Sequence, residues 1–348
     1  MTNSNDLYTG FSQLTRRRVV VLSSMFIALL VSLWLDILAG PAGLSAGQVL
    51  KGLIHPDTLE LRYQIILWDV RLPDALIALA VGAALGLSGI ETQTVLDNPL
   101  ASPFTLGVSS AAVVGASIAI VLIPDIPNLP TQFILPFLAL SGALGASLLV
   151  LFVVRISGGS RQTVVLFGIS LVFLCNAISS GFHLIADEDA LQQVVFWTIG
   201  NLTKAGWLEV AIVSSCFFII LPFSLKHVWL LTLLRGGEAH ARSTGVNVPR
   251  LRTWVIVRSS ILAAFAVCFV GTIGFVGLVG PHIARLLLGE DHRMLVPGAA
   301  ICGALLLSMA STLSKTLIPG VIIPVGILTA VVGVPLFLSL LFQRSRRQ

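Results

Sequence analysis

Long apolar segments alternate with short polar ones along almost the whole chain. Most of these segments have about the 20 residues that a transmembrane helix needs to cross a bilayer, whereas the eighth, 275–288, is shorter and is interrupted by Pro281. The pattern predicts an all-α, polytopic membrane protein with about ten transmembrane helices. An even number of spans places both termini on the same side. The predicted spans are 19–35, 73–92, 104–123, 133–154, 163–185, 207–225, 254–271, 275–288, 295–313 and 325–342.

The first apolar segment, Val19–Leu35, directly follows Arg16, Arg17 and Arg18 and has two interpretations. A basic stretch before an apolar one is also typical of a secretory signal peptide. This segment is long for the apolar part of a signal peptide, and no convincing A-x-A cleavage site follows it. We therefore predict that it stays in the protein as the first transmembrane helix.

The composition excludes the other broad classes. The chain has 348 residues, of which 56% are hydrophobic and 11% are charged, whereas about 25% of the residues of an ordinary soluble domain are charged. A soluble fold is excluded, because so few charged residues would not cover its surface. A disordered chain is excluded, because such chains contain few hydrophobic residues. The four cysteines lie in apolar segments without a CxxC motif, so a disulfide scaffold is excluded.

Small residues are frequent in the predicted spans, as in the GxxxG pattern Gly82–Gly86. Such residues permit close helix packing in lipid.

The distribution of charge predicts the orientation. If both termini are cytoplasmic, 15 of the 21 lysines and arginines fall in cytoplasmic segments, five fall outside, and Arg258 lies in the seventh span. Most acidic residues then fall on the outer side. This is the bias that the positive-inside rule describes, so we predict cytoplasmic termini. The basic residues are scattered over loop ends without an aromatic-rich basic face, so we expect no nucleic-acid partner.

Few ionisable residues lie within the predicted spans: Glu91 and Arg258, both near the cytoplasmic ends. Ion-coupled carriers usually keep a charged residue near the middle of the membrane, so a self-powered secondary transporter is disfavoured. The chain has no GxxxxGK[ST] phosphate-binding loop, so it does not bind and hydrolyse ATP in that way. The energy for transport must then come from a partner, unless the protein is a channel.

Candidate metal ligands and catalytic residues are not evident in the sequence. The six histidines have no metal-ligand spacing, and His282 after Pro281 is rejected as an iron ligand. The spans lack the facing His, Asp or Cys sets that a membrane enzyme would need. We therefore expect no metal site, no cofactor and no catalytic residue in this chain.

The longest cytoplasmic loop, about 226–253, contains a segment that can form a short helix. Glu238–Thr244 has helix-forming residues, and Gly245 fits the left-handed position that follows many helices. Such a helix is suited to docking into a groove on a cytoplasmic partner. From these residues alone, an ordinary solvated loop is an equal alternative.

This loop resembles the coupling loop of the FecCD-type permeases, the membrane subunits of ABC importers for iron–siderophore complexes, haem and cobalamin. The similarity extends, in order and at family spacing, over nearly the whole chain. Further blocks that carry it are Arg71-Leu-Pro73 with Val81–Gly89 and Asn98–Gly107, Gly274–Leu278 with Pro281–Arg285, and Ile323–Ile327 with Gly333–Phe337.

The resemblance implies one transmembrane permease domain over 1–348, with a cytoplasmic N-terminal segment (1–18), the coupling loop (226–253) and a cytoplasmic tail (343–348). It implies a translocation pathway formed with a second permease chain, identical or different, in the cytoplasmic (inner) membrane of a bacterium. Two cytoplasmic ABC ATPase subunits would bind ATP and magnesium, and an extracytoplasmic binding protein would deliver the cargo. A ferric siderophore is the expected cargo, and haem and cobalamin are alternatives. A secondary transporter is a less favoured reading.

The resemblance also implies roles for three groups of residues. The binding protein is expected to dock at the outer mouth, at Arg71, Asp74 and Lys315. A cytoplasmic gate is expected at Asn98, Pro99, Leu100, Gly159, Ser160 and Arg161. Coupling to the ATPase is expected at Arg235, Gly237, Glu238, Ala241, Arg242, Thr244 and Gly245. The gate segments have a plainer alternative, as structural turns.

Three positions depart from the family pattern, because Asp74, Ser311 and Lys315 stand where the family often has Arg, Asp and Arg. Lysine lacks the bidentate fork of arginine, and Asp74 reverses a charge at the expected docking face. This implies altered charges on the binding protein or a different second permease chain. Alternatively, Asp74 is only an acid that faces a helix dipole.

Two prolines mark expected helix starts. Pro73 is expected to begin the second span, and Ser102-Pro103 is expected to begin the third.

Overall fold

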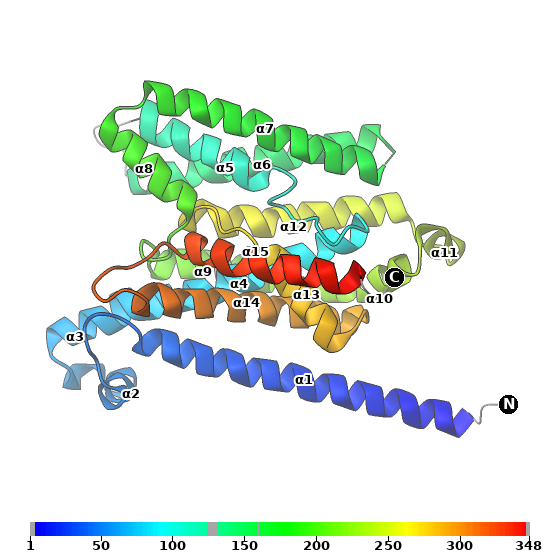
Figure 1. Cartoon of the computed structure of the whole chain (residues 1–348), viewed down its shortest axis with the longest axis horizontal. Helices are drawn as coiled ribbons and strands as arrows, with labels where there is room; N and C mark the ends of the chain where they lie inside the picture. The colour runs from blue at the N-terminus through cyan, green and yellow to red at the C-terminus, as the bar shows by residue number, and fades with distance from the viewer. Residues whose placement is uncertain (1–3, 124–130, 159, 346–348) are drawn as a thin grey trace.

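The computed structural model describes residues 4–123, 131–158 and 160–345. Its long helices lie side by side, roughly along one direction (Figure 1). Within the described residues, seven helices are long and apolar enough to cross a membrane. They are α1 (Ser4–Leu38), α4 (Leu72–Val95) continued from α3 (Leu61–Ile65), α6 (Thr131–Ile156), α7 (Arg161–Ile185), α9 (Trp207–Lys226), α12 (Val248–Val270) and α14 (His292–Thr316).

Shorter apolar helices occupy the three remaining predicted spans. They are α5 (Val108–Ser117), which continues as a π-helix to Leu122, α13 (Val276–Leu288) and α15 (Val325–Ser345). Each of the ten spans predicted from the hydrophobic pattern therefore coincides with an apolar helix. The prediction of an all-α, polytopic membrane fold is confirmed.

Short helices cover the two ends of the bundle (Figure 1). α2 (Ala46–Ile54), α3 and α8 (Glu188–Ile199) lie at one end, here called the α2 end. α10 (Val228–Arg235) and α11 (Glu238–Ser243) lie at the opposite end, here called the α11 end. The start of α1 and the end of α15 both point to the α11 end, as an even number of spans requires.

The hydrophobic pattern missed α2 and α8, although each carries a start signal in the sequence. Ser45 begins α2 in a capping box with Gln48, the S-x-x-Q arrangement that often starts a helix. Asp187 caps α8, and its carboxylate accepts a hydrogen bond from the N–H of Ala190 at 2.7 Å. Both helices are shorter than a membrane span, so a search for long apolar segments passes over them.

The second span starts earlier than the sequence predicted. α3 leads through a π-helix (Ile66–Arg71) into α4, so that one helical run covers Leu61–Val95. Pro73 is the second residue of α4, as expected, but α4 continues from the π-helix and has no free N-terminus. A proline lacks an N–H and crowds the carbonyl four residues earlier, which here is that of Asp69. Asp69 lies in the π-helix, whose wider turn accommodates the proline ring.

The third span starts later than predicted. Ser102 and Thr105 form a turn in which the N–H of Ser102 donates to the Thr105 hydroxyl at 3.0 Å. α5 begins only at Val108, after Gly107 with a φ of +86°. Ser102 therefore stabilises a turn instead of capping a helix, and the expectation for Ser102-Pro103 is wrong.

α4 is the central helix of the bundle and packs against α12, α13 and α14. Gly82 and Gly86 on α4 face Gly303 on α14 at very short range. A Cβ added at Gly303 would lie 2.2 Å from the carbonyl oxygen of Gly82. In lipid, small residues let helix backbones approach and gain van der Waals contact, so the predicted role of the GxxxG pattern is confirmed.

Candidate functional site: a charge network at the α11 end

α11 is a six-residue helix within the predicted coupling loop, and it lies at the tip of the α11 end (Figure 1). It follows Gly237, whose φ of +112° disfavours a side chain. It ends in a Schellman motif, in which the N–H of Gly245 bonds to the carbonyl of Arg242 and the N–H of Val246 to that of Ala241, both at 3.0 Å. Gly245 has a φ of +88°. The predicted helix and its terminal glycine are confirmed.

Ala241 packs α11 against the bundle, and Thr244 stabilises the end of this helix. The Ala241 side chain is fully buried, and the Thr244 hydroxyl donates a hydrogen bond to the Ala241 carbonyl at 2.8 Å. α11 lies against α10 and α12. Its remaining side chains, apart from Glu238, are exposed and can contact a partner.

Glu238, the first residue of α11, is paired with three arginines. Its carboxylate lies 2.6 Å from Arg242, 3.1 Å from Arg161 and 3.2 Å from Arg252. Arg242 belongs to α11 itself, whereas Arg161 begins α7 and Arg252 lies in α12. A single carboxylate therefore joins three helices.

The surroundings of Glu238 keep it ionised at neutral pH. Burial by itself would raise the pKa of Glu238, but the guanidinium groups of Arg252, Arg242 and Arg161 outweigh burial and lower the pKa below its usual value of 4.5. The position of an acid at the N-terminus of α11 is also favourable for the helix dipole. The ion pairs of Glu238 are thus fully formed at physiological pH.

Asp97 follows α4 and shares one of these arginines, Arg161, with Glu238. Its φ of +47° lies in the left-handed region, which costs free energy for a residue other than glycine. The N–H of Asn98 bonds to the carbonyl of Gln93 at 3.0 Å, which ends α4 in a second Schellman motif. This backbone directs the Asp97 carboxylate to within 2.7 Å of Arg161 and 3.0 Å of Arg235, and the charge attraction offsets the backbone cost.

The structure brings the two predicted gate segments together. In the α4–α5 turn, the side-chain oxygen of Asn98 accepts a hydrogen bond from the N–H of Leu100 at 2.9 Å, across Pro99. Ser160 caps the start of α7, and the ion pair between Asp97 and the first residue of α7 joins the turn to this helix. Gly159 lies outside the described residues.

Further pairs extend the cluster to α10, α13 and the end of α4. Arg235, the last residue of α10, lies 3.2 Å from Glu290, which lies 3.3 Å from Arg285 of α13. The buried Nε of Arg252 donates to the carbonyl of Val95, the last residue of α4, at 3.0 Å. We define the charge network as Asp97, Arg161, Arg235, Glu238, Arg242, Arg252, Arg285 and Glu290.

The charge network connects the predicted coupling helix to the predicted gate. Most of its side chains are partly exposed, and such ion pairs contribute only about 0.2–1 kcal/mol each. Individual pairs can therefore break and re-form at small cost when α11 moves. The arrangement is suited to passing a displacement of α11 on to the start of α7 and the α4–α5 turn.

At the α2 end, Arg71 is inside the chain and not at an open outer mouth. It is 4% exposed, and its guanidinium donates to the carbonyls of Ile37, Leu38 and Gly40 at 3.1, 3.0 and 3.3 Å. These carbonyls lie at the C-terminus of α1, where a helix leaves its acceptors unpaired. Arg71 therefore caps α1, and a docking role for it stays a prediction.

Lys315 and Asp74 are also buried at the α2 end. The Lys315 ammonium donates to a carboxylate oxygen of Asp36 at 3.0 Å, and the Ser311 hydroxyl donates to the same oxygen at 2.9 Å. Asp36 has no exposed surface, and Asp74 is 3% exposed. The departures at 311 and 315 thus belong to one internal site with Asp36. A docking role for Lys315 and Asp74 stays a prediction.

The spans contain more ionisable residues than the sequence predicted. Glu91 and Arg258 form a buried pair with a shortest distance of 2.6 Å. Asp36 and Lys315 lie beyond the ends of the predicted spans, and Asp74 lies at the start of 73–92, but all three lie within the longer helices α1, α14 and α4. Two buried clusters therefore tie helices together inside the apolar bundle.

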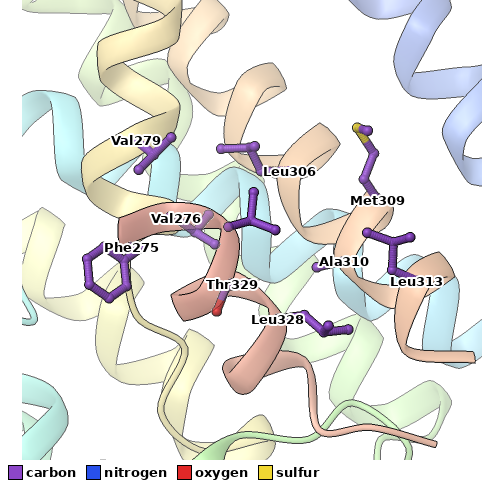
Figure 2. Close-up of a pocket in the computed structure, with 11 residues that line it drawn as sticks. Phe275, Val276, Val279, Leu306, Met309, Ala310, Leu313, Leu328 and Thr329 are labelled. Atoms are coloured by element: carbon purple, nitrogen blue, oxygen red, sulfur yellow. The ribbon is translucent and has the colours of Figure 1, made fainter. Parts of the chain in front are cut away.

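An apolar pocket lies between α13, α14 and α15 (Figure 2). Its volume is about 90 Å³, well below the about 300 Å³ at which small-molecule sites begin. Phe275 lines it with a φ of +66°, an uncommon conformation for an aromatic residue. Thr329 is the one polar side chain that Figure 2 labels. The pocket is too small to hold a large chelate within one chain.

The helical bundle and its similarity to known proteins identify the chain as a permease of the ABC importer class. Residues 28–343 match the model of the FecCD transport family, and the chain belongs to this family. It is 38% identical to the hemin transport system permease protein HmuU of Yersinia pestis, over 80% of this chain and 84% of that protein. It is 33% identical to the Fe(3+)-citrate import system permease protein YfmE of Bacillus subtilis, over 96% and 98%.

A solved structure agrees with this assignment. The fold is similar to that of a metal-chelate type ABC transporter in an inward-facing conformation, with a TM-score of 0.81 and 30% sequence identity. The alignment covers 93% of this chain and 99% of that chain. The likeness therefore extends over almost the entire described bundle.

Sequence reasoning missed Asp97, Arg252 and Glu290 as members of the site. Asp97 precedes Asn98-Pro99, and this Asp-Asn-Pro run is a turn signal that places a carboxylate at a helix end. Arg252 and Glu290 carry no comparable local signal, because each also bonds to a residue far away in the sequence, Val95 at 157 residues from Arg252 and Arg235 at 55 residues from Glu290. Only the fold brings them to the charge network.

Proposed function

We propose that this chain is the membrane-spanning permease subunit of an ATP-driven importer for a ferric siderophore. It forms the translocation pathway with a second permease chain in the cytoplasmic membrane of a bacterium. An extracytoplasmic binding protein delivers the chelate at the α2 end, and two ATPase subunits bind at the α11 end. ATP hydrolysis belongs to those partners, and this chain has no catalytic residue.

The observation that carries the proposal is the link between α11 and the gate segments. Glu238 contacts Arg161 at the start of α7, and Arg161 contacts Asp97 in the α4–α5 turn. A short exposed helix at one end of a bundle is suited to docking on an ATPase. Because the ion pairs of α11 connect it to the gate segments, a movement of the ATPase that displaces α11 would also displace the gate segments.

The exposed face of α7 supports a pathway that needs a second chain. Ser170, Asn176 and Ser180 are exposed on this helix. The serine hydroxyls donate to carbonyls of their own helix at 3.0 and 2.9 Å, but the Asn176 amide would face lipid in an isolated chain. A polar group in hydrocarbon costs free energy, so this face is suited to a water-filled path between two permease chains.

The proposed cargo is iron bound in an organic ligand. The relatives named above carry hemin and citrate-chelated iron, and both cargoes are iron bound in an organic ligand. A chelate arrives with its metal already coordinated, so the permease needs no iron ligand of its own. Haem is the second candidate, favoured by the similarity to the hemin permease.

The test is uptake of radiolabelled ferric siderophore, haem and cobalamin by iron-starved cells with and without this chain, and after ATP depletion. We expect siderophore uptake that disappears on deletion and on ATP depletion. If only haem or only cobalamin is taken up, that compound is the cargo instead of a ferric siderophore. Uptake that persists without ATP would contradict the importer.

The matched variants are Glu238→Arg with Gly245→Pro, which disrupts α11, and Arg250→Gln, which removes one exposed charge from the same loop. Both should reach the membrane in equal amounts. We expect the first to lose uptake and ATPase co-purification and the second to keep both. Normal uptake by the first variant would contradict the coupling role of α11.

A further inference from the structure

A second group of arginines lies at the α11 end, on the side of the bundle formed by α1, and does not belong to the charge network. Arg18 on α1 and Arg293 on α14 share the carboxylate of Asp291, at 3.4 and 2.7 Å. Arg16 and Arg17, in the same turn of α1 as Arg18, are exposed. Four positive charges therefore stand beside one negative charge.

An exposed tryptophan completes this group. The Arg293 guanidinium lies over the ring of Trp229 on α10, 4.6 Å from the ring centroid, and Trp229 is 59% exposed. Tryptophan rings are enriched at the level of lipid headgroups, and a guanidinium is attracted to the face of such a ring. We define the arginine patch as Arg16, Arg17, Arg18, Trp229, Asp291 and Arg293.

The backbone between α13 and α14 makes room for Arg18. Gly289 has a φ of +80°, and a Cβ at this position would lie 3.1 Å from the Arg18 guanidinium. Asp291, two residues later, caps α14 by accepting the N–H of Arg293 at 3.1 Å. The positions of Arg18 and Arg293 are therefore fixed by the fold.

The arginine patch adjoins apolar surface. Val19 and Val20, directly after Arg18, are 46% and 61% exposed, and exposed apolar residues continue along α1 to Leu35. A ligand that contacts both parts must have a negative head and a long apolar tail. Inorganic phosphate meets only the first requirement, whereas an anionic phospholipid meets both.

We infer that the arginine patch binds the headgroup of an anionic phospholipid whose acyl chains lie along α1. Basic residues at the membrane surface are attracted to anionic lipid, and Trp229 holds Arg293 at headgroup level. The inference requires only that the chain crosses a membrane, and it is independent of the cargo. The bound lipid would hold the peripheral helix α1 against α14.

The test uses the full chain, purified in detergent and titrated with dioleoyl phosphatidylglycerol or dioleoyl phosphatidylcholine, with bound lipid counted by native mass spectrometry. Arg18→Gln with Arg293→Gln should weaken phosphatidylglycerol binding about tenfold and leave phosphatidylcholine binding unchanged. The control, Arg155→Gln with Arg250→Gln, removes two exposed charges elsewhere at the same end and should change neither.

A second variant separates lipid binding from a structural role. Arg18→Lys with Arg293→Lys keeps both charges but loses the bidentate contact to Asp291, so it should bind phosphatidylglycerol within about threefold of the natural chain. An equal loss in the Lys and Gln variants would overturn the inference. Displacement of the lipid by millimolar inorganic phosphate would overturn it in favour of a free-phosphate site. Unchanged lipid binding with reduced ATPase co-purification in the Gln variant would overturn it in favour of a protein contact.

Discussion

The carboxylate of Glu238 lies 3.1 Å from the guanidinium of Arg161, although the two residues belong to helices that are separated in the chain by α8, α9 and α10. Glu238 begins the predicted coupling helix, and Arg161 begins the helix after the predicted gate hairpin. Arg161 also lies 2.7 Å from Asp97. One guanidinium therefore stands between the surface that an ATPase would contact and the turn that would narrow the pathway.

Arg161→Gln should lower ATP-driven uptake severalfold with little effect on stability. The substitution removes both ion pairs of Arg161, and partly exposed pairs contribute only about 0.2–1 kcal/mol each. Uptake and thermal unfolding of the purified chain measure the two effects. Arg155→Gln on α6, an exposed arginine near the same hairpin, is the control and should change neither. A loss of stability in proportion to the loss of uptake would contradict a coupling role.

Glu238→Gln should destabilise the chain at neutral pH and not in acid. The arginines lower the pKa of Glu238 below 4.5 in the folded state, so the ionised carboxylate stabilises the fold above its unfolded pKa. This stabilisation is lost as the pH falls through the lower folded pKa. The difference in unfolding temperature between the natural chain and the variant should be constant from about pH 8 to about pH 5.5 and shrink below about pH 4.5.

The control for this pH dependence is Glu188→Gln, an exposed acid in the first turn of α8 at the α2 end. At neutral pH this variant should lower the unfolding temperature much less than Glu238→Gln does, because Glu188 lacks the three arginines that surround Glu238. A Glu238→Gln difference that stays constant down to pH 3 would show that a contact other than the ionised carboxylate is responsible.

Local patterns in the sequence predicted the parts of the fold that local chemistry determines. All ten spans follow from apolar length, and the helix end at Gly245 follows from the left-handed position that glycine favours. The Asn98-Pro99 turn follows from the restriction that proline imposes on the residue before it. None of these needs information about a distant residue.

The positions of charged residues could not be predicted in the same way. Arg71 and Lys315 stand at the ends of apolar segments, where a charged residue is ordinarily exposed. Their partners are the end of α1 and Asp36, which is 279 residues from Lys315. A buried charge is tolerated only if such a partner exists, and a partner that distant leaves no trace in the local pattern. The same holds for the bond of Arg252 to Val95 and the ion pair of Glu290 with Arg235, which join residues 157 and 55 positions apart.

Lys315→Met should strongly destabilise the chain, because it leaves the buried Asp36 carboxylate without its cation. Removing one partner of a buried ion pair typically costs about 3–5 kcal/mol. Asp36→Asn together with Lys315→Met removes both charges and should recover most of this loss. Unfolding by sodium dodecyl sulfate in mixed micelles measures the free energy, and Lys51→Met, at an exposed lysine of the α2 end, is the control.

The same variants test docking. If Lys315 contributes to association of the binding protein, the rate should fall at low salt both in Lys315→Met and in the double variant, since both lack the cation. If Lys315 acts only within the chain, the double variant should associate at the natural rate. A slow, salt-dependent association of the double variant would therefore support the docking prediction.

Gly303→Ala and Gly145→Ala should have opposite effects, although both replace a glycine inside a long apolar helix. A Cβ at Gly303 would lie 2.2 Å from the carbonyl oxygen of Gly82, whereas a Cβ at Gly145 on α6 has nothing within 4 Å. Gly303→Ala must push α14 away from α4, and overpacking of this kind costs about 1–3 kcal/mol. Gly145→Ala should stabilise the chain by about 0.4–1 kcal/mol, because it restricts the unfolded chain. Unfolding by sodium dodecyl sulfate measures both, and equal destabilisation by the two substitutions would contradict the close contact between α4 and α14.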